Sequence, residues 1–177
     1  MDKKIIIGVV LFTILILGGG ILYSNSSPTK AKSDLAKATV EKTAGAKIQI
    51  FEENFDFKDI KYDAGNAKHP FKIKNNGTKD LTIANMATSC MCTKVYLQTN
   101  KEKSPEFGMK GGHGSGEDGS SWTGVIKPGE EAQVFADYDP TAHGPQGVGP
   151  ISRLVSFETN DPDKPYVEFT FSGNVIK

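Results

Sequence analysis

An alternation of apolar and polar residues begins at Ile48 and continues, broken by turn-forming residues, almost to the C-terminus. Apolar side chains at every second position line one face of a β-strand, because successive side chains point to opposite faces of a sheet. The alternating pairs are Ile48 and Ile50, Phe55 and Phe57, Phe71 and Ile73, Leu81 and Ile83, Val95 and Leu97, Ala132 and Val134, Val155 and Phe157, and Phe169 and Phe171. About seven or eight short strands with a turn signal every ten residues or so predict an all-β, immunoglobulin-like antiparallel β-sandwich over residues 48–177.

Three connections are marked by their composition. Asn75-Asn76-Gly77 supplies residues that tolerate positive φ, which predicts a hairpin between the flanking strands. Lys127-Pro128-Gly129-Glu130 predicts a type I or type II turn. From Thr99 to Ser121 the chain is rich in Gly, Ser and Lys, and loops of that length are usually functional or disordered.

The N-terminus carries an uncharged apolar run from Ile5 to Tyr23. Its roughly 19 residues span about 28 Å as a helix, enough to cross a bilayer once. We therefore expect residues 1–23 to be a signal-anchor transmembrane helix; a cleaved signal peptide is the alternative, since Ser24-Asn25-Ser26 could serve a peptidase.

Residues 24–47 are mostly small and polar, which predicts a flexible linker between the membrane and the domain. Lys3 and Lys4 precede the apolar run and favour a cytoplasmic N-terminus. The expected location is thus the cell membrane, with one span and the C-terminal domain outside the cytoplasm.

The charge balance excludes several function classes. The sequence has 21 Lys and Arg against 21 Asp and Glu, so no net field attracts nucleic acid. Gly112-His113-Gly114-Ser115-Gly116 lacks the spacing of a nucleophile elbow, and the chain has no Gly-Lys-Ser phosphate loop. We expect the membrane and an unknown protein or surface as partners.

The sequence contains 2 cysteines, Cys90 and Cys92, in an otherwise β-like run. On an extended strand, residues two apart lie about 6.6 Å from each other, whereas a disulfide needs Cβ atoms about 3.8 Å apart. A Cys90–Cys92 bond therefore requires a bend, and an ordinary disulfide staple is not the expectation.

Soft sulfur donors cluster around these cysteines. Met86 and Met91 flank the pair, and Met109 and His113 lie in the long loop that follows. Thiolate and thioether ligands select Cu(I), so Cys90, Cys92, Met86, Met91, Met109 and His113 form a candidate copper site, with His143 as an additional donor. Cu(I) is the one cofactor that the sequence suggests.

Two alternatives compete with this metal site. A buried cysteine or methionine is often an ordinary core residue, and His143 can be explained as a turn residue. A thiol–disulfide role requires a cation beside a sulfur. Lys94 is close in the sequence but is expected to point to the other face from Thr93, and Arg153 is expected to pair with Asp139 or Asp161. The usual Cys-x-x-Cys at a helix start is missing.

Several segments in the same order resemble a known bacterial family. Phe55-Asp56-Phe57, the Phe71–Gly77 strand and turn, Ser89-Cys90-Met91-Cys92-Thr93, Pro128-Gly129-Glu130 and Asn160-Asp161-Pro162 are similar to the Ig-like family catalogued as domain of unknown function 1573. The resemblance covers roughly residues 50–176. It implies a small extracytoplasmic Ig-like sandwich without a settled activity, related in architecture to modules of cilium- and centrosome-associated proteins. Met91 stands where the family usually has glycine, and the Thr99–Ser121 loop is longer than its usual connection.

The sequence thus favours a membrane-anchored, extracytoplasmic Ig-like module that binds a partner or has a structural role and is not an enzyme. The first alternative is a Cu(I)-binding protein of the cell envelope, and the second is an envelope thiol oxidoreductase. These alternatives differ in what Cys90 and Cys92 do.

Overall fold

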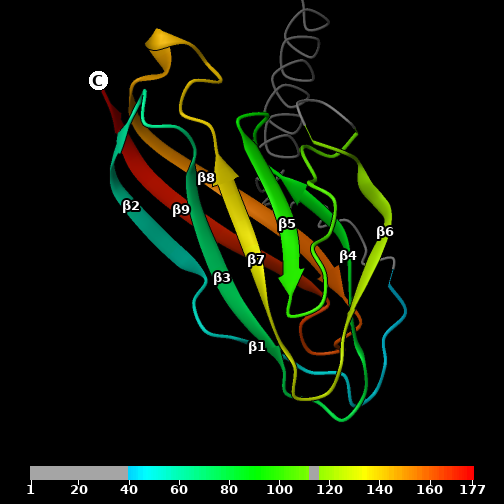
Figure 1. Cartoon of the computed structure of the whole chain (residues 1–177). Helices are drawn as coiled ribbons and strands as arrows, with labels where there is room; N and C mark the ends of the chain where they lie inside the picture. The colour runs from blue at the N-terminus through cyan, green and yellow to red at the C-terminus, as the bar shows by residue number, and fades with distance from the viewer. Residues whose placement is uncertain (1–39, 112–115) are drawn as a thin grey trace, which may run out of the picture. The chain divides into compact units, whose positions relative to one another are not determined.

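The computed structural model describes residues 40–111 and 116–177 (Figure 1). The expected transmembrane helix, most of the expected linker and His113 lie outside these residues. In the part that is described, no helix is long and apolar enough to cross a membrane.

The alternating segments form strands at the predicted places. These are β1 (Ile48–Ile50), β2 (Asn54–Lys61), β3 (Ala67–Asn75), β4 (Leu81–Thr88), β5 (Thr93–Thr99), β6 (Gly119–Ile126), β7 (Glu131–Tyr138), β8 (Gly149–Thr159) and β9 (Tyr166–Ile176). A short 3₁₀ helix, Pro145–Gly147, interrupts the connection between β7 and β8.

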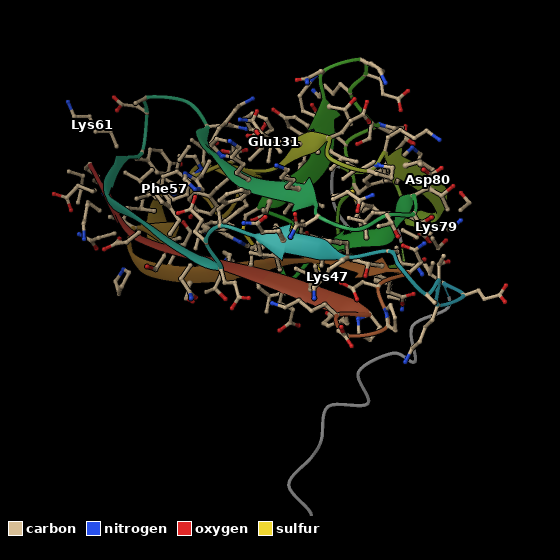
Figure 2. The ribbon with its side chains drawn as sticks, turned by 90° about the horizontal axis from the view of Figure 1, so that it is seen from below. Lys47, Phe57, Lys61, Lys79, Asp80 and Glu131 are labelled. Carbon is tan, nitrogen blue, oxygen red and sulfur yellow. A yellow bond between two sulfur atoms is a disulfide. The ribbon has the colours of Figure 1, made fainter. Side chains whose placement is uncertain are left out.

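The strands make two sheets that pack face to face, which confirms the all-β sandwich (Figure 1). One sheet has the order β1-β3-β7-β5 and the other the order β2-β9-β8-β4-β6. Figure 2 shows the two layers from below, with Lys61 at one end of the domain and Lys79 and Asp80 at the other.

The core lies between the layers and is built from the alternating residues. Phe71 of β3 stacks on Phe169 of β9 with ring centroids 4.5 Å apart, so the two sheets meet through aromatic rings. Side chains from every predicted alternating segment except the Phe55 segment are buried, among them Ile48, Phe71, Ile73, Leu81, Ile83, Val95, Leu97, Val134, Val155, Phe157, Phe169 and Phe171.

The antiparallel assignment is wrong for one edge of the second sheet. β2 pairs with β9 in parallel, with Phe55 opposite Phe171. The other strand pairs are antiparallel. Alternation reports which face of a strand is buried but not the direction of its neighbour, so it could not reveal this pairing.

The hairpin predicted at Asn75-Asn76-Gly77 is also wrong, because β3 and β4 belong to different sheets. The prediction depended on positive φ angles within this segment. Among the described residues, positive φ angles occur only at positions outside it. Asn75 instead stabilises the connection in which the chain crosses from one sheet to the other. Its buried side-chain amide donates to the carbonyls of Lys79 and Ile126, each at 2.8 Å, and accepts from the Gly77 amide at 2.9 Å.

The turn at Pro128-Gly129 is confirmed. The Glu130 amide donates to the Lys127 carbonyl at 3.0 Å, and Gly129 has a φ of 80°. A positive φ at the third position of a turn is the feature of type II, and it explains the glycine.

The long connection after β5 is partly packed on the sandwich. Phe107 is 1% exposed, and its backbone exchanges hydrogen bonds of 2.8 and 2.9 Å with Val95 of β5. This segment therefore covers the open edge of β5, and residues 119–121, which were expected in the loop, begin β6.

The last part of the expected linker also packs on the domain. The Thr43 amide donates to the Asn160 carbonyl at 2.8 Å, and Ala46 is 3% exposed. The ordered domain therefore begins before Ile48.

Candidate functional site

The two cysteines lie in the turn between β4 and β5, not on a strand as the sequence suggested. The Thr93 amide donates to the Cys90 carbonyl at 3.1 Å, and the Thr88 hydroxyl donates to the same carbonyl at 3.0 Å. This turn supplies the bend that a Cys-x-Cys bond requires. The cysteines form a disulfide with their Cα atoms 5.2 Å apart, so the expectation that they would not pair is corrected.

The two sulfurs differ in their surroundings. Cys92 is 2% exposed and belongs to the hydrophobic core, whereas Cys90 is only partly buried. Met91 between them is 49% exposed. Cys90 is thus the more accessible of the two sulfurs.

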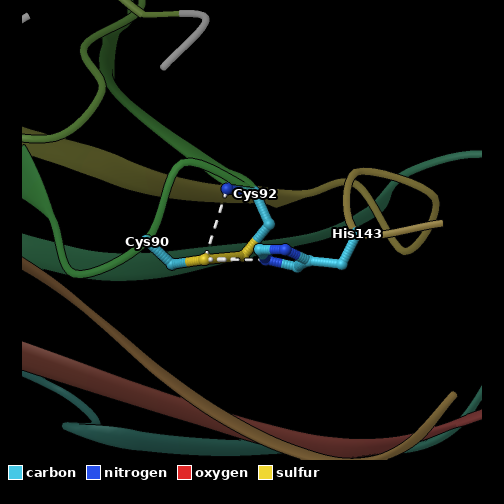
Figure 3. Close-up of side chains that lie close together, drawn as sticks. All are labelled: Cys90, Cys92 and His143. Carbon is cyan, nitrogen blue, oxygen red and sulfur yellow. Dashed lines mark hydrogen bonds between the residues drawn. A yellow bond between two sulfur atoms is a disulfide. The ribbon is translucent and has the colours of Figure 1, made fainter. Parts of the chain in front are cut away.

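A histidine distant in the sequence lies against the exposed sulfur. His143 comes from the connection between β7 and β8, and its Nε2 is 3.3 Å from the Cys90 Sγ (Figure 3). The Gly144 amide donates to the Thr141 carbonyl at 2.8 Å, which closes a turn around His143. His143 was named from the sequence as an additional donor, and the fold brings it to the cysteines.

An arginine lies against the buried sulfur. The Arg153 Nε, from β8, donates to the Cys92 Sγ at 3.2 Å, while Nη1 donates to the Ser152 carbonyl at 2.8 Å. The predicted ion pair of Arg153 with Asp139 or Asp161 is wrong. Among the described residues, Asp139 accepts hydrogen bonds from Thr141, and Asp161 accepts them from the amides of Ile48 and Asp163.

Arg153 is the residue at this site that the sequence analysis did not place beside the cysteines. It is separated from Cys92 by 61 positions, and no local pattern links the two. The nearer cation, Lys94, pairs instead with Glu106 at 3.2 Å. Hydrogen bonds from Lys103 and Lys94 hold the pKa of Glu106 below its ordinary value.

The end of β7 lies beside the same turn. The Asp139 amide donates to the Cys92 carbonyl at 2.8 Å, and Tyr138 pairs with Thr93 in the sheet. Burial raises the pKa of Tyr138, an effect that the positive charge of Arg153 partly offsets.

A pocket of about 580 Å³ opens next to the disulfide. It is lined by Asn66, Met91, Cys92, Lys94, Asp137, Asp139 and Ala142. The Asp137 carboxylate in this pocket is 2.7 Å from both Lys68 Nζ and Asn66 Nδ2, so a protein cation already balances its charge.

The methionines of the candidate copper site lie in different environments. Met86 is 1% exposed in the core, and Met109 is half-buried where its backbone bridges to Thr88. Met91 lies on the turn itself, and His113 is outside the described residues. The donor atoms of Cys90, Cys92 and His143 all lie within 4.8 Å of one another.

Comparisons with solved structures find the same kind of fold. A protein of unknown function from Porphyromonas gingivalis W83 is 16% identical, with a TM-score of 0.53, over 78% of this chain and 51% of that chain. The chain thus spans about half the length of that protein. At this identity, the likeness shows the fold alone.

Two further structures are similar at lower scores. The ASH / PapD-like domain 7 of human CEP192 is 14% identical, with a TM-score of 0.45, over 78% of this chain and 92% of that one. The class 5 fimbriae chaperone CfaA is 11% identical, with a TM-score of 0.43, over 74% and 57%.

A search of the curated proteins finds no match for the chain. The sequence itself matches one family over the segment that runs from β1 past the cysteine turn. Residues 48–108 match the family described as "Protein of unknown function (DUF1573)", which confirms the resemblance to that family over this segment.

Proposed function

We propose that this protein is an Ig-like module, tethered to the membrane and exposed outside the cytoplasm, whose Cys90–Cys92 pair exchanges electrons with the thiols of a partner protein. The observation that carries the proposal is the placement of one basic side chain against each sulfur: His143 at 3.3 Å from Cys90 and Arg153 at 3.2 Å from Cys92. The Arg153 guanidinium is a permanent cation, and a nearby cation favours the thiolate, which is the reactive form of cysteine.

The unequal burial of the sulfurs supports one direction of attack. A thiolate of the partner attacks the accessible Cys90 Sγ, the disulfide breaks, and Cys92 leaves as a thiolate. Arg153 donates to that leaving sulfur, which lowers the free energy of the developing anion. A mixed disulfide between Cys90 and the partner results.

The second half of the exchange completes the electron balance. A second thiolate of the partner attacks its own sulfur in the mixed disulfide and releases Cys90 as a thiol or thiolate. The partner leaves as a disulfide, and the Cys90–Cys92 pair has gained two electrons. The pocket beside Met91 and Cys92 offers room for the residues that flank the partner's cysteine.

The reduction potential of the full chain in detergent micelles tests this proposal. The chain is equilibrated with defined ratios of oxidised and reduced glutathione or dithiothreitol, and free thiols are trapped by alkylation. We expect a midpoint above about −270 mV, in the range of proteins that exchange disulfides. A disulfide that stays intact below about −300 mV is structural and would overturn the proposal.

Two matched variants test the direction of attack. Cys92→Ser keeps the accessible sulfur, and Cys90→Ser keeps the buried one. We expect Cys92→Ser to form a mixed disulfide with oxidised glutathione at least ten times faster than Cys90→Ser. Equal rates would contradict the assignment of Cys90 as the attacked residue.

The membrane tether and the outward placement of the domain remain part of the proposal. They are supported by the apolar run of Ile5–Tyr23, by Lys3 and Lys4, and by the disulfide, since disulfides persist in oxidising compartments. Protease added to spheroplasts should degrade the domain, and N-terminal sequencing of the membrane fraction should find residues 1–23 uncleaved. A domain protected in spheroplasts but degraded after lysis would contradict the placement.

A further inference from the structure

We propose that Cys90, Cys92 and His143 bind one Cu(I) ion when the disulfide is reduced, so that the redox state of the pair controls metal binding. The inference deepens the proposed function, because it requires the same two thiols. It differs from the copper site expected from the sequence, since the methionines and His113 are not needed as ligands.

The geometry of three donors carries the inference. The Sγ atoms of Cys90 and Cys92 and a ring nitrogen of His143 lie within 4.8 Å of one another (Figure 3). Metal–sulfur and metal–nitrogen bonds of about 2.0 to 2.3 Å place the donors of a planar three-coordinate ion roughly 3.7 to 4.0 Å apart. Reduction lets the two sulfurs separate to that spacing, and the His143 Nε2 already lies 3.3 Å from one of them.

The donor set favours Cu(I) over Zn(II). Two thiolates and an imidazole are soft or intermediate ligands, and Zn(II) prefers four of them in a tetrahedron. In the described part of the chain, no carboxylate belongs to this cluster. The nearest acidic side chains of the pocket are engaged: Asp137 pairs with Lys68, and Asp139 accepts from Thr141.

The charge of the site also favours Cu(I) over Zn(II). Two thiolates bound to a monovalent ion retain one negative charge, and the Arg153 guanidinium that contacts Cys92 balances it. A divalent ion would neutralise the thiolates by itself and leave Arg153 as an uncompensated positive charge beside a partly buried site.

Metal binding and disulfide formation exclude each other at these sulfurs. Binding requires both cysteines as thiolates, so two thiols release two protons as one Cu(I) binds. Oxidation to the disulfide removes two electrons from the same sulfurs and leaves no thiolate ligand. The oxidised chain should therefore not bind Cu(I) at this site.

The test is a Cu(I) titration of the full chain in detergent micelles, reduced with a phosphine and handled without oxygen, against the chelator bicinchoninate. We expect one Cu(I) per reduced chain and none in the oxidised chain. Cys90→Ser should weaken binding at least 100-fold and His143→Gln at least 10-fold. Met109→Leu is the matched control and should keep the affinity within a factor of two.

Four results would overturn the inference: unchanged affinity in His143→Gln, binding retained in the Cys90→Ser, Cys92→Ser double variant, Cu(I) binding by the oxidised chain, or tighter binding of Zn(II) than of Cu(I). X-ray absorption of the copper-loaded chain should show two sulfurs and one nitrogen.

A copper-free exchange assay with chelator present separates the two proposals. Normal exchange without copper binding would contradict only the metal site. Copper binding by the phosphine-reduced chain, if glutathione and dithiothreitol cannot reduce its disulfide, would contradict only the exchange function.

Discussion

The Arg153 Nε donates a hydrogen bond to the Cys92 Sγ at 3.2 Å, joining β8 to the turn between β4 and β5. The sulfur is buried and the guanidinium is half-exposed, so the contact places a permanent positive charge at the inner end of the disulfide. His143 contacts the outer end.

The first prediction concerns the contribution of Arg153 to the reduction potential. Arg153→Gln should make the potential more negative by roughly 30 to 60 mV, because a charge-assisted hydrogen bond contributes roughly 1.5 to 3 kcal/mol and 30 mV corresponds to about 1.4 kcal/mol in a two-electron couple. Glutathione titration of both proteins measures the shift.

The matched control is Lys94→Gln, which removes the same charge two residues from Cys92. In the described part of the chain, Lys94 pairs with Glu106 and forms no hydrogen bond with either sulfur. Its potential should change by less than about 10 mV. Equal shifts in the two variants would mean that net charge, not the contact, sets the potential.

The second prediction is that the domain stays folded when the disulfide is reduced. The bond closes a loop of only three residues, so the chain-entropy model assigns it roughly 1 to 2 kcal/mol of stability. The core formed by Phe71, Phe169 and their neighbours does not depend on it. Thermal unfolding followed by circular dichroism should show one transition, lower by less than about 10 °C with reductant. Loss of the transition on reduction would identify a structural staple instead.

The third prediction concerns Asn75, which holds the crossing from β3 to β4. Asn75→Ala should lower the free energy of unfolding by about 2 to 4 kcal/mol, because it removes three hydrogen bonds and leaves the buried carbonyl of Ile126 without that donor. Denaturant titration measures the change.

The neighbouring Asn76 provides the control for this experiment, since its side chain is exposed. Asn76→Ala should change the free energy of unfolding by less than about 0.5 kcal/mol. Similar losses in both variants would show that the turn needs asparagine for its backbone conformation and not for the buried amide.

The fourth prediction is a loss of stability at alkaline pH that depends on Tyr138. Burial raises the pKa of this hydroxyl above the ordinary value of 10.0. The stability is fully present below pH 10, and it falls as the pH rises through the folded-state pKa, because the unfolded chain releases the proton first. Denaturant titrations between pH 8 and 11 should show a steeper fall in the wild type than in Tyr138→Phe; equal slopes would contradict this account.

The sequence alone determined the positions of the strands, much of the core and the resemblance of residues 48–108 to a known family. Alternating pairs such as Phe71 and Ile73 predict burial because the period of a strand is a local property of the backbone. The turn at Gly129 was predictable for the same reason, since a positive φ is a local demand that glycine meets.

Only the tertiary structure decided which strands share a sheet and which side chains meet at the cysteines. The parallel pairing of β2 with β9, the connection between the sheets at Asn75 and the contact of Arg153 with Cys92 all join residues that are far apart in the sequence. Such contacts depend on the path of the whole chain, and no local spacing records them. The cysteines were a candidate site from the sequence, but the side chains that contact them, Arg153 and His143, come from β8 and from the loop after β7.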